Sequence, residues 1–85
     1  MRGRKNLYSD FYCTHCGNFV MTLPRPLGHQ RAGGHLKNLY CPHCRTEYNC
    51  VEVPEKGQYT KECFLYEFNC NNFTESGLRK ENLIK

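Results

Sequence analysis

The sequence has no tryptophan, and apolar residues make up only 39% of its 85 residues, fewer than the ~45–50% typical of globular domains. Its apolar runs are a few residues long, whereas a membrane-spanning helix needs about 20. The chain is also too short for more than one small domain. These absences exclude a large enzyme, a Rossmann or P-loop domain and a membrane-spanning protein. A hydrophobic core of this size contributes only ~3–5 kcal/mol, so a further source of stability is expected.

Cysteine, by contrast, is abundant. The chain has seven cysteines, an odd number that cannot pair completely. Residues 1–6 are basic but are not followed by the apolar segment of a secretory signal. We therefore expect a cytoplasmic protein, in which thiols stay reduced. In that compartment clustered cysteines are more often metal ligands than disulfides.

Two short motifs carry the strongest signal, because residues 12–16 and 40–44 both read Tyr-Cys-x-His-Cys. Two such CxxC turns, called knuckles below, can direct four thiolates at one point, which suits tetrahedral Zn²⁺. An iron centre of rubredoxin type uses the same ligands and stays an alternative. Four cysteines leave no open position for water or substrate, so we expect one structural zinc and no enzyme activity. The predicted ligands are Cys13, Cys16, Cys41 and Cys44.

The other three cysteines lack ligand spacing. We expect Cys50 to pack in a sheet, and Cys63 and Cys70 to share one face of a helix as apolar or free thiols. A second metal site that combines these cysteines with His29 or His35 is the less favoured alternative. The histidines inside the knuckles are expected at exposed tips.

The pattern predicts a small metal-stabilised α+β fold, a zinc ribbon of about three short antiparallel strands followed by one helix. β-Branched and aromatic residues favour strands over 19–23, 36–40 and 48–53. The prolines and glycine of residues 24–28 are expected to end the first of these strands.

A helix is predicted over residues 61–70, because Thr60 is a suitable N-cap and Glu62 lies in the first turn. Its apolar stripe, Phe64, Leu65 and Phe68, is expected to be buried against the ribbon. The expected organisation is a flexible basic arm at 1–10, a zinc ribbon at 11–57, a helix packed on it at 58–73 and a frayed tail at 74–85.

Residues 11–17, 31–44, 49–53 and 59–68 together resemble a group of small zinc-ribbon proteins encoded by bacteriophages and mobile elements of Gram-positive bacteria. The similarity covers residues 11–73, and the stretch 31–44 makes it more specific than the cysteines alone. The resemblance implies a phage accessory protein in the bacterial cytoplasm, with the four knuckle cysteines as ligands. Such proteins mostly have no assigned activity.

Two binding functions remain open. Basic and aromatic side chains suit contact with nucleic acid or with nucleic-acid machinery. The alternative is a protein that inhibits a host enzyme or defence complex. Residues 24–38 contain no acidic residue and are expected to loop out from the metal-bound scaffold and carry the partner contacts. We expect a monomer without a small-molecule substrate. The candidate partner-binding residues are Arg25, His29, Arg31, His35, Lys37 and Arg45.

Overall fold

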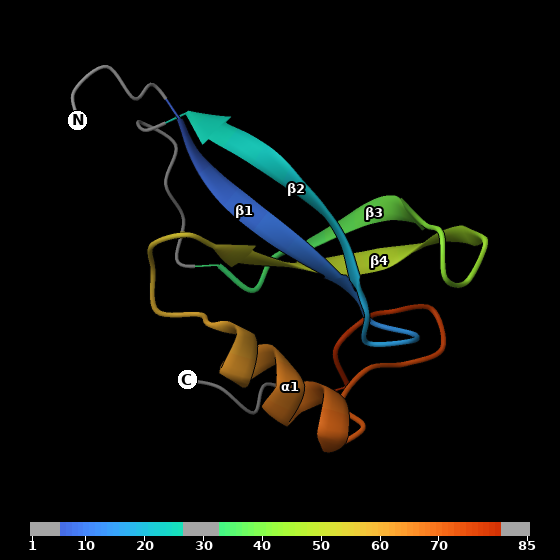
Figure 1. Cartoon of the computed structure of the whole chain (residues 1–85). Coiled ribbons are helices and arrows are strands. Elements are labelled where there is room, and N and C mark those ends of the chain that lie inside the picture. Colours follow the sequence, from blue (N-terminus) through green and yellow to red (C-terminus); the bar gives the residue numbers. More distant parts are fainter. Residues whose placement is uncertain (1–5, 27–32, 81–85) are drawn as a thin grey trace.

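The computed structural model describes residues 6–26 and 33–80. Its four strands form one antiparallel sheet in the order β2-β1-β4-β3, followed by one helix (Figure 1). This agrees with the predicted small antiparallel sheet and single helix, with four strands in place of about three. The elements are β1 (Asn6–Cys13), β2 (Phe19–Pro26), β3 (Leu36–Cys41), β4 (Thr46–Pro54) and α1 (Lys61–Asn69).

Strand β1 corrects the prediction of a flexible arm, because residues 6–10 lie in the sheet; residues 1–5 are outside the described part. β1 pairs with β2 on one side and with β4 on the other. Its side chains alternate between the two faces, as they must in a strand. Leu7, Ser9 and Phe11 are buried on one face, and Tyr12 is buried on the other.

Strand β2 continues past the proline that was expected to end it. Pro24 pairs with Tyr8, and the strand runs to Pro26. The prediction was wrong because β2 lies at the end of the sheet. An end strand has a neighbour on one side only, so it tolerates a residue that lacks an N–H group.

The sheet consists of two hairpins, β1–β2 and β3–β4, which are joined through the central strands β1 and β4. One face, the metal face, buries Phe11, Cys13, Cys41 and Cys50. The end strands β2 and β3 also contact each other, so the sheet curls over this face. The opposite face, the helix face, packs a cluster that includes Tyr12, Val51 and Phe64.

Helix α1 begins as predicted, because the Thr60 hydroxyl accepts a hydrogen bond from the N–H of Cys63 at 3.4 Å. Phe64 is fully buried, and its ring stacks on that of Tyr12 with centroids 5.4 Å apart. The predicted apolar stripe is only partly right, since Leu65 is 36% exposed and Phe68 is half-buried. At nine residues, α1 is far from membrane-spanning length, and the described residues contain no other α-helix.

The segment after α1 corrects the prediction of a frayed tail over residues 74–80. It folds back beside the first knuckle (Figure 1), and Phe73 forms a β-bridge with Arg79. The Arg79 guanidinium forms an ion pair with the buried carboxylate of Glu67, with Nε 2.6 Å from Oε2. It also donates to the carbonyl oxygen of Gly34 at 2.7 Å. Residues 81–85 lie outside the described part.

Candidate metal centre

Each hairpin turns at one CxxC pair. The N–H of Gly17 donates to the carbonyl of Cys13 at 2.8 Å, and the N–H of Arg45 donates to the carbonyl of Cys41 at 2.7 Å. Gly17 and Arg45 both have left-handed backbone conformations, with φ values of 77° and 61°. The two turns therefore have the same shape, although only glycine adopts that conformation without steric cost.

The two turns bring the four predicted ligands together, with their Sγ atoms all within 4.8 Å of one another. The Sγ atoms of Cys16 and Cys41 are 3.6 Å apart, and those of Cys13 and Cys44 are 3.9 Å apart. Sulfurs at ~2.3 Å from a tetrahedral metal ion lie ~3.8 Å from one another. The four cysteines are thus positioned to bind a metal ion, as the sequence predicts.

The first knuckle also contacts the second through His15. The backbone N–H of this residue donates to the Sγ atom of Cys13 at 3.3 Å, and its ring Nδ1 lies 3.4 Å from the Sγ atom of Cys44. The ring stacks on that of Tyr48 with centroids 4.6 Å apart and an interplanar angle of 3°. His15 is exposed, as expected; its contact with a ligand of the other hairpin was not predicted.

The thiols of the cluster differ in acidity. Burial raises the pKa of Cys44, and its hydrogen bonds to the other cluster thiols raise it further. The pKa of Cys16 is lowered, because hydrogen bonds from the N–H of Asn18 and from neighbouring thiols outweigh the effect of burial. A metal ion deprotonates its coordinating thiols, so metal binding here is expected to release protons.

The remaining cysteines lie outside this cluster. Cys50 is fully buried in β4, as predicted, and burial raises its pKa to about 12. Cys63 is half-buried in α1 and Cys70 is exposed at its C-cap, and both are free thiols. Across residues 6–26 and 33–80 the structure forms no second group of potential metal ligands.

Arg25, a candidate partner-binding residue, is engaged within the protein. Its Nε lies 3.0 Å from a carboxylate oxygen of Glu52, and its guanidinium lies over the ring of Phe11, 5.4 Å from the centroid. Glu52 is buried and also accepts a hydrogen bond from the Ser9 hydroxyl. The charge of Arg25 is therefore compensated on the metal face rather than presented by a free loop.

The other candidates are placed differently. His35 and Lys37 are exposed at the start of β3, and Arg45 is exposed in the second knuckle. His29 and Arg31 lie outside the described residues. The structure thus places three of the six candidates on the hairpin β3–β4 or just before it.

The burial of two carboxylates was not predicted from the sequence. Glu52 and Glu67 are 4% and 0% exposed, and each binds an arginine that is distant in sequence. The one available signal for Glu67 is its position three residues after Phe64 on the same helix, where a side chain shares the buried face. Nothing in the sequence identifies Arg25 as the partner of Glu52 or Arg79 as the partner of Glu67.

The chain was compared with protein-family models, curated proteins and solved structures, and none of them matches it.

Proposed function

We propose that this protein is a zinc ribbon whose single zinc ion is structural and whose task is to bind a partner rather than to catalyse a reaction. The four-sulfur cluster supports this proposal, because thiolates favour zinc and four of them fill its coordination sphere. The cluster joins the two hairpins, because each contributes one CxxC pair to it. Zinc binding would supply the stability that this small core lacks.

We further propose that the partner is single-stranded nucleic acid, bound by a surface on the hairpin β3–β4. This surface, called the second-knuckle surface, consists of Tyr40, His43 and Arg45, all exposed; Lys37 lies on the opposite face of β3. The observation that carries the proposal is Tyr40, a residue that is 53% exposed on the end strand β3. An exposed aromatic ring on a strand that leads into a turn with a cationic side chain, Arg45, suits base stacking with phosphate contact.

The predicted positive surface has fewer uncompensated cations than the sequence suggests. Arg25 is neutralised by Glu52, and Glu47 lies opposite Tyr40 in the register of β3 and β4. The second-knuckle surface therefore has few cations, and its affinity for single-stranded nucleic acid should be modest. Each phosphate contacted on a single strand contributes a slope of about −0.7 to log K against log salt.

The test is fluorescence anisotropy of a labelled, mixed-sequence single-stranded oligonucleotide with the zinc-loaded protein. A lost stacking contact costs ~1–3 kcal/mol, so Tyr40→Ala should weaken binding by about tenfold. The matched control is Tyr66→Ala, which removes a tyrosine that is 57% exposed on α1 and should leave binding unchanged. Equal binding by the two variants contradicts the proposed surface.

The second candidate function is that of an inhibitor that docks on a host protein. It is favoured by the exposed large apolar and aromatic residues Leu65, Tyr66 and Leu78. Salt separates the two functions, because binding through phosphates weakens steeply between about 50 and 200 mM salt. A protein interface with an apolar centre depends on salt much less.

A further inference from the structure

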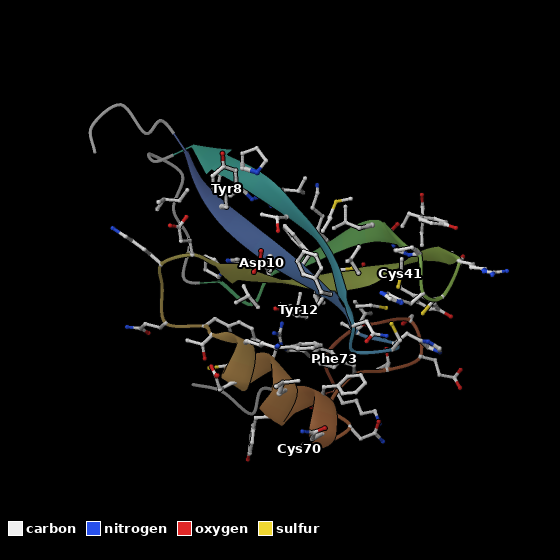
Figure 2. The ribbon with its side chains drawn as sticks, viewed as in Figure 1. Tyr8, Asp10, Tyr12, Cys41, Cys70 and Phe73 are labelled. Atoms are coloured by element: carbon white, nitrogen blue, oxygen red, sulfur yellow. The ribbon has the colours of Figure 1, made fainter. Side chains whose placement is uncertain are left out.

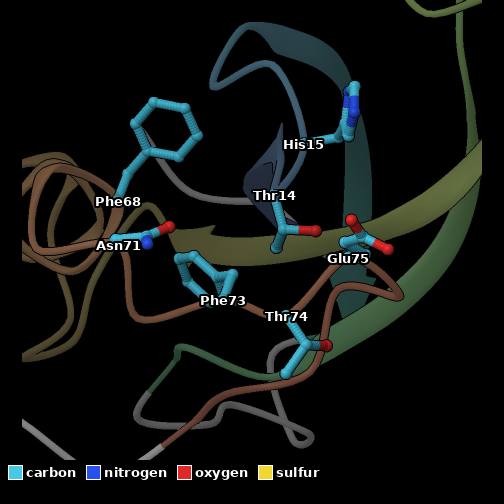
Figure 3. Close-up of a pocket in the computed structure, with 7 residues that line it drawn as sticks. All are labelled: Thr14, His15, Phe68, Asn71, Phe73, Thr74 and Glu75. Carbon is cyan, nitrogen blue, oxygen red and sulfur yellow. The ribbon is translucent and has the colours of Figure 1, made fainter.

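A pocket of about 220 Å³ lies between the first knuckle and the segment that follows α1 (Figure 3). This volume is below the ~300–1,000 Å³ of pockets that hold drug-sized ligands. It suits one long side chain of a partner. The pocket is lined by Thr14, His15, Phe68, Asn71, Phe73, Thr74 and Glu75.

The walls of the pocket differ in chemistry. Figure 3 shows the phenyl rings of Phe68 and Phe73 on one side and Glu75 with His15 on the other. Glu75 is exposed, and within the described residues its carboxylate has no ion pair. None of the described residues that line the pocket is a lysine or an arginine. An occupant must therefore combine an apolar stem with a positive end, and a phosphate group would be repelled.

The same protein already binds two of its own arginines in this way. Arg25 lies over the ring of Phe11 and pairs with Glu52. Arg79 lies over the ring of Phe73, 5.6 Å from its centroid, and pairs with Glu67. In both cases a guanidinium pairs with one carboxylate and lies over aromatic rings, one for Arg25 and two for Arg79, a combination that matches its planar donors and its charge.

We propose that the pocket binds an arginine side chain of a protein partner. The stem of the arginine packs on Phe68 and Phe73, and its guanidinium donates to the carboxylate of Glu75. The carboxamide oxygen of Asn71 is a second acceptor at the rim. Lysine fits less well, because a carboxylate binds the planar guanidinium through two parallel hydrogen bonds.

The test is an NMR titration of the ¹⁵N-labelled, zinc-loaded full chain with an acetylated Gly-Gly-Arg-Gly-Gly amide. The control peptide carries citrulline, which has nearly the shape of arginine but no charge. We expect the arginine peptide to shift the amide resonances of Thr14, Asn71 and Glu75. Because a partly exposed ion pair contributes little, we expect the citrulline peptide to bind about fivefold more weakly.

Variants test the assignment of the carboxylate. Glu75→Gln should reduce binding of the arginine peptide to the level of the citrulline peptide. Glu62→Gln makes the same change at an exposed position outside the pocket and should bind like the unaltered protein. Asn71→Gly removes the amide and keeps the left-handed backbone of that residue (φ 59°), and it should weaken binding by a smaller factor.

Several results would overturn the proposal. They are equal binding of the arginine and citrulline peptides, shifts confined to residues outside the pocket, or no change with Glu75→Gln. A titration in which a nucleoside monophosphate shifts the pocket resonances, but the arginine peptide does not, would reassign the pocket to a base. The second-knuckle surface shares no residue with this pocket, so the two proposals can fail separately.

Discussion

The metal face and the helix face of the sheet are closed by different means. On the metal face four sulfurs meet beside Phe11 and Cys50, and the sheet curls over them without a covering helix. On the helix face aromatic rings pack together, and the buried Glu67 binds Arg79 from the following segment. Figure 2 shows Tyr12 and Phe73 in the layer between the sheet and α1.

The comparison shows where stability is concentrated. The metal face has one candidate metal site, and zinc binding at such sites contributes ~10–16 kcal/mol in small domains. The helix face depends on many contacts that contribute a few kcal/mol or less each. Loss of one ligand should therefore unfold the metal face, whereas loss of one side chain should only weaken the helix face.

The largest effect is expected from removal of the metal. Cys41→Ser, or a chelator added to the unaltered protein, should abolish metal binding and unfold the sheet, since Cys41 is a fully buried member of the four-sulfur cluster. Metal analysis and circular dichroism measure the two effects. The matched control is Cys70→Ser, which changes an exposed cysteine outside the cluster. A metal-free protein with an intact sheet would contradict the prediction.

A smaller effect is expected from breaking the buried ion pair on the helix face. Arg79→Met leaves the carboxylate of Glu67, which is 0% exposed, with Tyr59 and Asn72 as its donors among the described residues. Removing one partner of such a pair costs ~3 kcal/mol, measured by urea unfolding in excess zinc. Lys80→Met alters the neighbouring exposed cation and should cost almost nothing. Equal free energies of unfolding for the two variants would show that the Arg79–Glu67 ion pair does not stabilise the fold.

Acid should affect the helix face through the same carboxylate. Burial alone would raise the pKa of Glu67, but hydrogen bonds from Arg79 and Tyr59 outweigh it and lower the pKa. The resulting stability is present above the ordinary pKa of glutamate and is lost as pH falls through the lower, folded-state value. Urea unfolding of the unaltered protein and of Glu67→Gln across this range should therefore show a difference that shrinks with acid. Acid affects the thiolates equally in the two proteins, so that effect cancels in the comparison. A difference in the free energy of unfolding that does not change with pH would contradict the assignment of this acid effect to Glu67.

The smallest effects are expected where the two knuckles differ. Arg45→Gly removes a side chain from a left-handed residue and should stabilise the protein by ~0.5–1 kcal/mol. Gly17→Ala should destabilise it, because the added Cβ would lie 2.9 Å from the ring of Phe68 and the φ value is positive. Thermal unfolding of the zinc-loaded variants measures both signs. If both substitutions change the unfolding temperature in the same direction, the two turns do not share the requirement for a left-handed residue at positions 17 and 45.

Local features of the fold could be predicted from the sequence, whereas contacts between distant residues could not. The CxxC spacing identified the four cysteines that lie in position to bind a metal ion, because two thiols on one turn define half of a metal site. The helix start was predictable from Thr60 for a similar reason. Strand β1 was missed because its alternation includes Ser9 and Asp10 and follows a basic segment.

The ion pairs were missed for a different reason. Arg25 and Glu52 are 27 residues apart, and Glu67 and Arg79 are 12 apart. No sequence periodicity links positions that far apart. A buried, paired charge therefore cannot be distinguished in the sequence from a charge exposed to solvent. The misassignment of Arg25 to a free loop and of residues 74–80 to a frayed tail both follow from this.

The placement of the ligands early in the chain has a consequence for the order of assembly. The ribosome has delivered all four sulfurs once Cys44 is made, and the last strand once Pro54 is made. Arg79, which fastens α1 to Glu67 and Gly34, follows later. Because the chain leaves the ribosome from its N-terminus, the four cysteines and β4 emerge before α1, and they can bind a metal ion and complete the sheet before the helix packs. The aromatic side chains of the helix face then stay uncovered until the segment after α1 leaves the exit tunnel.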